Sequence, residues 1–152
     1  MNEAELKLPQ TPVLNSDGNS QFVIGDKVAA LSALKTLAND CTPNNWDGNG
    51  AEAINPHAVT NAENFLRALP ENFPLPEFAV EPDGNVSLDW IRSRDCLFSL
   101  SVGGNQRLAF AWLEGTDRGH AVVRFDGQQV PNRILEGIMA VMNYGNASVR
   151  AA

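Results

Sequence analysis

The second half of the chain contains four short segments in which apolar and polar residues alternate. Such alternation, with a period of two, is typical of antiparallel strands that bury one face and leave the other open. Tight-turn signals separate the segments, among them Arg94-Asp95 and Gly103-Gly104-Asn105. The pattern therefore predicts a meander of strands over Val86–Trp90, Phe98–Val102, Leu108–Trp112 and Ala121–Phe125, with a turn over Glu114–Gly119.

Helical periodicity flanks these strands. Apolar residues recur at helical spacing after Asp26, an acceptable N-cap, and again after Pro56 and Pro131. A further short strand, Phe78–Val80, follows the second helix. Because helices and strands come in separate runs, we predict an α+β fold in which an antiparallel meander sheet of about five strands carries helices packed on one face.

The length of 152 residues suits one domain with its own core. The first 20 residues are rich in Pro, Asn and Ser and have no sustained period, and the last few are polar. We predict a mobile N-terminal arm over 1–20, a single α+β domain over 21–145 and a polar tail over 146–152.

Acidic residues outnumber basic ones by 18 to 11, which gives a net charge of −7. No base occurs between Arg67 and Arg92, where five acids fall: Glu71, Glu77, Glu81, Asp83 and Asp89. This balance argues against direct binding of nucleic acid, because phosphate neutralisation needs clustered Lys and Arg. It suits a basic protein partner, since complementary charge raises the rate of encounter. The alternative is that the charge serves solubility alone.

The positions that alternate with the predicted core residues carry small side chains. These positions are Ser87, Asp89, Ser99, Ser101, Ala109 and Ala111. Small side chains let another surface approach the backbone closely, so this face of the sheet is a candidate for docking a protein. The alternatives are a plain solvent-exposed face and a face that the N-terminal arm covers.

Motifs of metal binding and catalysis are missing from the sequence. His57 and His120 stand alone, and no pair of cysteines or histidines has ligand spacing. A dyad of Cys41 with His57, or of Cys96 with His120, needs only spatial adjacency and stays open. We predict no metal, no cofactor and no enzymatic activity.

Cys41 and Cys96 are too few and too far apart for a disulfide framework. We predict two free thiols in a cytoplasmic protein. The N-terminus lacks a basic region followed by an apolar run, and no stretch approaches the length of a membrane span. The expectation is a protein that is neither exported nor bound to a membrane.

A long segment between the first two helices, Cys41–Asn55, is rich in Asn, Gly, Pro and Asp and contains Trp46. Loops of this length are often functional, and Trp concentrates binding energy at interfaces. The alternative is that Trp46 fills the core and Asp47 caps a turn. The predicted partner-binding residues are Trp46, Asp47, Glu77, Glu81, Asp83 and Asp89.

Several short motifs cover roughly residues 44 to 113. They are Trp46-Asp47-Gly48-x-Gly50-Ala51, Ile54-x-Pro56, Ala62-x-x-Phe65-Leu66-x-x-Leu69-Pro70 and Pro82-Asp83-Gly84-x-Val86-x-Leu88-x-Trp90. Together they resemble a loose group of small, uncharacterised bacterial proteins with a Trp-Asp-Gly-x-Gly-Ala loop. Members often lie beside toxin-like or mobile-element genes, so the resemblance implies an antitoxin, immunity or inhibitor role. It carries over no catalytic residue.

The leading hypothesis is an acidic protein-binding inhibitor of antitoxin, immunity or phage-encoded anti-defence type. It would mask a basic surface of a toxin, a nuclease, or another protein or nucleoprotein complex. The alternative is a small enzyme or metabolite-binding domain with its pocket at the Trp46 loop. A third hypothesis is a homo-oligomer that buries its C-terminal helix or an edge strand against a copy of itself.

Overall fold

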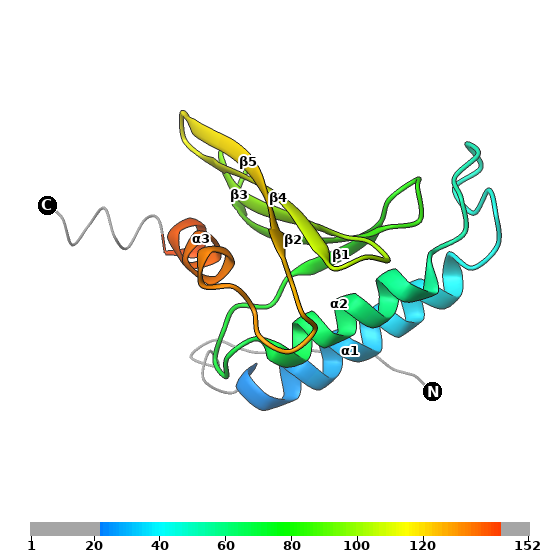
Figure 1. Ribbon diagram of the computed structural model, residues 1–152, viewed down its shortest axis with the longest axis horizontal. Coiled ribbons are helices and arrows are strands. Elements are labelled where there is room, and N and C mark those ends of the chain that lie inside the picture. Colours follow the sequence, from blue (N-terminus) through cyan, green and yellow to red (C-terminus); the bar gives the residue numbers. More distant parts are fainter. Residues whose placement is uncertain (1–21, 144–152) are drawn as a thin grey trace, which may run out of the picture.

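The computed structural model describes residues 22–143, with side chains from Lys27 onward, and these residues form three helices and one five-stranded sheet (Figure 1). The predicted N-terminal arm over 1–20 and the polar tail over 146–152 lie outside the described residues. The elements follow in the order α1 (Phe22–Asp40), α2 (Pro56–Ala68), β1 (Glu77–Val80), β2 (Val86–Ser93), β3 (Cys96–Val102), β4 (Arg107–Glu114), β5 (Asp117–Arg124) and α3 (Asn132–Met142).

The sheet is a simple meander in which each strand pairs antiparallel with the next, in the spatial order β1-β2-β3-β4-β5. The predicted α+β fold with its five-stranded antiparallel sheet is confirmed. Since four antiparallel pairings separate β1 from β5, these two edge strands run in the same direction.

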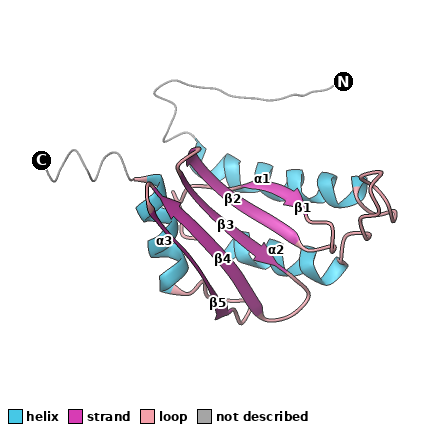
Figure 2. Cartoon of the chain, turned by 90° about the horizontal axis from the view of Figure 1, so that it is seen from above, coloured by secondary structure: helices cyan, strands magenta, loops and turns pink. Residues whose placement is uncertain are grey.

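All three helices lie on one side of the sheet, and Figure 2 looks onto the other side. We call the helix-covered side the inner face and the opposite side the outer face. The inner face supplies the core through alternate residues of β2, β3 and β4, and α2 and α3 add their apolar stripes. The fully buried large side chains include Trp90, Phe98, Leu88, Leu100, Leu108, Phe65, Leu66, Ile134 and Ile138.

Aromatic rings link the layers of this core. The ring of Phe65 in α2 meets that of Trp90 edge-on at 6.3 Å between centroids, and Trp90 meets Phe98 at 6.0 Å. The Trp90 indole N–H donates to the carbonyl of Pro74 at 2.9 Å, so the buried ring leaves no polar atom unpaired. No helix within residues 22–143 has the length and apolar character needed to cross a membrane.

Several boundaries differ from the predictions, and the starts of the first helix and of the last strand differ most. The first helix begins at Phe22, before the expected N-cap Asp26. The last strand begins at Asp117 because Gly115, with a φ of 66°, allows a tight turn directly after Glu114. Gly119, predicted in the turn, belongs to the strand, where it pairs with Trp112. A Cβ on Gly119 would lie 2.4 Å from Cζ2 of Trp112, so this strand position needs a glycine. His120, which lay outside the predicted strand Ala121–Phe125, therefore sits inside β5.

Candidate functional site

The Trp46 loop and the β1–β2 turn form one surface, although about 30 residues separate them in the chain. The amide of Glu52 donates to the carbonyl of Pro82 at 2.8 Å, and the amide of Asn55 donates to that of Gly84 at 2.9 Å. Gly84 permits this approach because a Cβ on it would stand 2.7 Å from the carbonyl oxygen of Ala53. These main-chain hydrogen bonds fix the loop against the turn.

Side chains within the loop hold its shape. The Trp46 indole N–H donates to the carbonyl of Glu52 at 2.8 Å, and its half-buried ring packs against the core. Asp47 accepts hydrogen bonds from the amides of Asn49 and Ala51 at 2.8 and 3.1 Å. These two bonds lower the pKa of Asp47 below its ordinary value. Both predicted loop residues thus stabilise the loop itself.

Carboxylates from several segments gather at this end of the molecule. We call the set Asp40, Asp47, Glu52, Glu81 and Asp83 the acidic end. Asp40 ends α1, and the next residue, Cys41, accepts a hydrogen bond from the amide of Ile54. Between Lys35 and Arg92 the sequence contains nine acids and one base, Arg67. The sequence pattern does not single out Asp40 and Glu52, because only the fold joins their segments to the β1–β2 turn that carries Glu81 and Asp83.

Two of the predicted acids are tied to serines on the outer face. Asp89 accepts hydrogen bonds from the hydroxyls of Ser87 and Ser99 at 2.8 and 2.6 Å. Glu81 accepts one from Ser101 at 2.9 Å. Partial burial raises the pKa of Glu81 above its ordinary value. The negative charges of Asp83 and Asp89 also raise this pKa, whereas the hydrogen bond from Ser101 lowers it. The remaining predicted acid, Glu77, is exposed and pairs with Asp89 in the β1–β2 register.

The six small residues predicted to point away from the helices share the outer face, as the register requires (Figure 2). No described helix covers them. A shallow hollow of 260 Å³ lies over the serines and alanines of β3 and β4, beside His120 and Val122 of β5. The outer face is therefore open and has small side chains at its centre.

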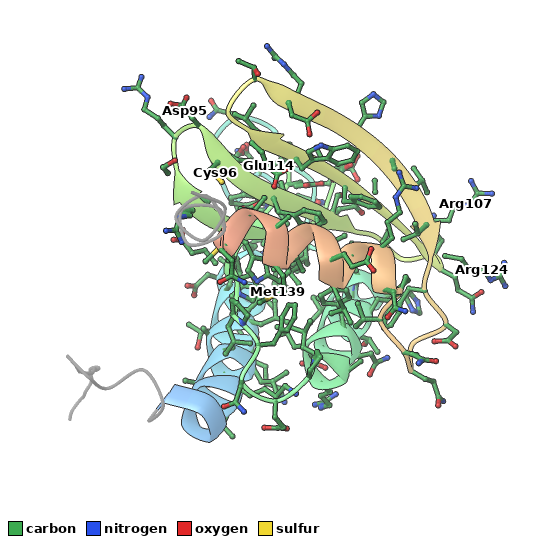
Figure 3. The ribbon with its side chains drawn as sticks, turned by 90° about the vertical axis from the view of Figure 1, so that its left-hand side faces the viewer. Asp95, Cys96, Arg107, Glu114, Arg124 and Met139 are labelled. Atoms are coloured by element: carbon green, nitrogen blue, oxygen red, sulfur yellow. The ribbon has the colours of Figure 1, made fainter. Side chains whose placement is uncertain are left out.

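The outer face also carries residues that the sequence analysis did not single out. Arg107 and Arg124 are directly opposite each other in the β4–β5 register, and they lie at the same end of the two strands (Figure 3). Arg118 and His120 precede Arg124 at alternate positions of β5. Across the opposite end runs an apolar row of Ile91, Leu97 and Leu113. The face thus has acids on its β1–β2 side and bases on its β4–β5 side.

The surroundings of the two cysteine thiols do not fit a catalytic role. The Cys96 Sγ donates to the carbonyl of Val141 at 3.3 Å on the inner face (Figure 3), whereas His120 lies on the outer face. A Cys96–His120 dyad is therefore wrong, because the sheet separates the two side chains. Burial raises the pKa of both Cys96 and Cys41. A raised pKa is the opposite of what an activated nucleophile needs.

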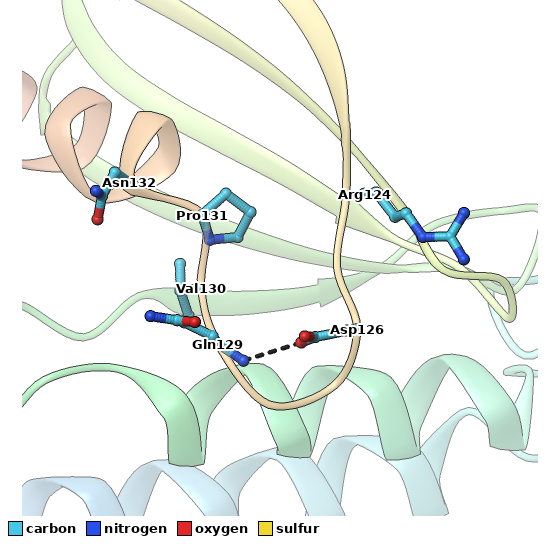
Figure 4. Close-up of a pocket in the computed structure, with 6 residues that line it drawn as sticks. All are labelled: Arg124, Asp126, Gln129, Val130, Pro131 and Asn132. Atoms are coloured by element: carbon cyan, nitrogen blue, oxygen red, sulfur yellow. Dashed lines mark hydrogen bonds between the residues drawn. The ribbon is translucent and has the colours of Figure 1, made fainter.

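A hollow of 490 Å³ lies between the end of β5 and the start of α3 (Figure 4). Asp126, which lines it, accepts hydrogen bonds from the amides of Gln128 and Gln129, and these bonds lower its pKa. This carboxylate thus shapes the connection into α3. A third hollow, of 640 Å³, lies at Arg118 and His120, and none of the three hollows is lined by the Trp46 loop. Among the described side chains, from Lys27 to Asn143, no group of three His, Cys, Asp or Glu residues could hold a metal ion.

Known proteins give no guide to this site. The chain matches no family model, no curated protein and no solved structure. The resemblance to small proteins beside toxin-like genes stays a prediction, and the interpretation of the site depends on its geometry.

Proposed function

We propose that the protein is an acidic protein-binding inhibitor whose acidic end docks on a basic surface of a partner. One observation carries this proposal: carboxylates from α1, the Trp46 loop and the β1–β2 turn share one end of the molecule, held there by main-chain hydrogen bonds. The segment that supplies them contains one base among nine acids.

A group of carboxylates like this one mainly raises the rate at which the protein and a basic partner encounter each other. It attracts a basic partner over about one Debye length, roughly 8 Å at physiological salt, and repels acidic competitors. A basic surface that binds nucleic acid, as on a toxin or a nuclease, would lose its ligand when covered. The resemblance to proteins of antitoxin, immunity or anti-defence type agrees with this role. Direct binding of nucleic acid or of a membrane is not part of the proposal.

The acids differ in how free they are to meet a partner. Asp83 accepts hydrogen bonds from the amide and side chain of Asn85, and Asp47, Glu81 and Asp89 are also used as acceptors. The exposed side chains of Asp40 and Glu52 make no hydrogen bond or ion pair among the described residues. Reversing these two charges therefore tests recognition without removing a described contact.

The test compares the wild-type chain with Asp40→Lys/Glu52→Lys and with a matched control, Asp117→Lys/Glu136→Lys. The control makes the same change in net charge at exposed positions of β5 and α3, away from the acidic end. Each protein is used to capture partners from a lysate of the host, and the retained proteins are quantified by mass spectrometry. We expect a basic protein to be retained by the wild type and the control, released by raised salt, and lost on the acidic-end variant.

Equal recovery on all three proteins would contradict the proposal. Purified partner then allows the association rate to be measured, and the acidic-end variant should associate at least about tenfold more slowly at low salt. A partner activity assay with and without the chain tests the inhibitory role.

The alternative, a small enzyme or metabolite-binding domain with a pocket at the Trp46 loop, has less support. The polar atom of Trp46 is already bonded to Glu52, and the hollows described above lie elsewhere. We therefore keep a binding protein as the proposal.

A further inference from the structure

The two edge strands place acidic side chains of β1 and basic side chains of β5 at matching positions of the outer face. We call residues that are paired one after another across the five strands a row. Glu77 of β1 and His120 of β5 are the two ends of one row. Ala79 shares the next row with Val122. Because β1 and β5 run in the same direction, continuing two residues along each brings Glu81 and Arg124 to the same end. Along β1 the outer face thus presents an acid, a small residue and a second acid. At the matching positions along β5 it presents His120, the apolar Val122 and Arg124.

We propose that two copies of the chain stack their outer faces about a two-fold axis parallel to the strands. This axis places β1 of one copy over β5 of the second copy. Glu81 then faces Arg124, Glu77 faces His120, and Ala79 makes room for Val122, each pair occurring twice by symmetry. A two-fold axis perpendicular to the strands would instead set β1 on β1, with acids against acids. Charge therefore selects the first arrangement.

The rest of the face suits close contact between two sheets. Ser99, Ser101, Ala109 and Ala111 occupy the centre, where the axis passes, and their small side chains allow the two backbones to approach. In the apolar row, Ile91 would cover Leu113 of the second copy, and Leu97 would meet its own counterpart. Val122 and Ile91 are 57% and 49% exposed, although they are large and apolar. Stacking would remove both from water.

The size of the face indicates a modest affinity. Five strands about 4.8 Å apart and roughly 25 Å long give a contact on the order of 500 Å² per copy. That value is somewhat below the roughly 600 Å² per partner of stable specific interfaces and falls among weak, transient ones. The dimer should thus dissociate in the micromolar range.

The dimer goes beyond the proposed function and can be tested without a partner. Sedimentation equilibrium of the full chain at physiological salt, from roughly 1 to 300 μM, brackets the dissociation constants of such interfaces. We expect the average mass to rise from monomer to dimer across this range. The variants Glu81→Lys and Arg124→Glu should each weaken the dimer at least about tenfold, because symmetry turns two attractions into two repulsions.

An equimolar mixture of these two variants tests directly whether positions 81 and 124 of two chains face each other. In a mixed dimer the two substituted positions would face each other with opposite charges, and the unchanged Arg124 of one chain would face the unchanged Glu81 of the other. The mixture should therefore dimerise with about the affinity of the wild type, while each variant alone dimerises at least about tenfold more weakly. Control reversals on the helix side, Glu136→Lys and Arg67→Glu, should leave the mass distribution unchanged, and circular dichroism confirms that every variant is folded.

A wild-type chain that remains monomeric over the whole range would overturn the proposal, as would a mixture of folded variants that remains monomeric. Loss of dimerisation in the helix-side controls would also overturn it, since it would move the contact to the other face. Glu81 belongs to both surfaces, but the test of the acidic end changes Asp40 and Glu52, which lie outside the stacked rows, so the two proposals can fail separately.

Discussion

Gly137 of α3 lies against the ring of Phe98 in β3, so closely that a Cβ on Gly137 would stand 2.6 Å from Cε2 of Phe98. Ala is better than Gly in a helix by about 1 kcal/mol, but overpacking a buried ring costs about 1–3 kcal/mol. Gly137→Ala should therefore lower the free energy of unfolding by about 1 kcal/mol in urea denaturation. In a Phe98→Leu background the same change should be neutral or stabilising. A more stable Gly137→Ala single variant would show that α3 can move away from the sheet.

Gly84 has a φ of 90° and faces the Ala53 carbonyl, whereas Gly48 has a φ of 76° and open space around its Cα. Gly48→Ala should cost only the strain of a left-handed residue, about 1–2 kcal/mol. Gly84→Ala adds a clash between two backbones, so it should cost about 1–3 kcal/mol more. Denaturation of the two variants in parallel measures the difference. Equal costs would mean that the loop separates easily from the β1–β2 turn.

Trp46 is expected to act through its indole N–H as well as its ring. Trp46→Phe keeps an aromatic ring and removes the hydrogen bond to Glu52, which should lower stability by about 0.5–1.5 kcal/mol. Trp46→Ala should cost several times more if the ring fills the core. An alanine variant as stable as the phenylalanine variant would instead identify the ring as a surface group available to a partner.

Glu81 should make stability depend on pH. Because its pKa in the folded chain is raised above the ordinary 4.5, the charged form destabilises the fold at neutral pH. This cost disappears as the pH falls through the raised pKa. Glu81→Gln should therefore melt at a slightly higher temperature than the wild type at pH 7, and the two curves should converge below about pH 4. The increase in the free energy of unfolding should be a fraction of a kcal/mol, since solvent screens a half-exposed carboxylate.

The two thiols should be inert in the folded chain. Both are buried and free, and burial raises the pKa of each. Alkylation at pH 8 should be at least about tenfold slower than in the urea-unfolded chain, because reaction requires local opening. Rapid modification of one cysteine, located by peptide mapping, would show that its part of the core opens readily.

The alternation of Val86–Trp90 and Phe98–Val102 was sufficient to predict the sheet, because a strand with one buried face needs that period. The same pattern did not predict the place of Gly119. Glycine usually indicates a turn, but here it leaves room for the ring of Trp112, a tertiary contact that no local rule contains.

The candidate site was partly predictable. The acids between Arg67 and Arg92 were evident as a run without bases, yet their union with Asp40 and Glu52 depends on hydrogen bonds between distant segments. Arg107 and Arg124 were missed because the sequence pattern alone does not pair them. Their shared row on the outer face exists only once the β4–β5 register is known.

The hydrogen bonds that join Glu52 to Pro82 and Asn55 to Gly84 also have a consequence for affinity. A free loop that binds must lose conformational entropy, roughly 1–2 kcal/mol for each residue whose backbone becomes fixed. Here that loss accompanies folding of the chain itself. A partner docking on the acidic end would meet a preorganised surface, so little of its binding energy would be spent on ordering the loop.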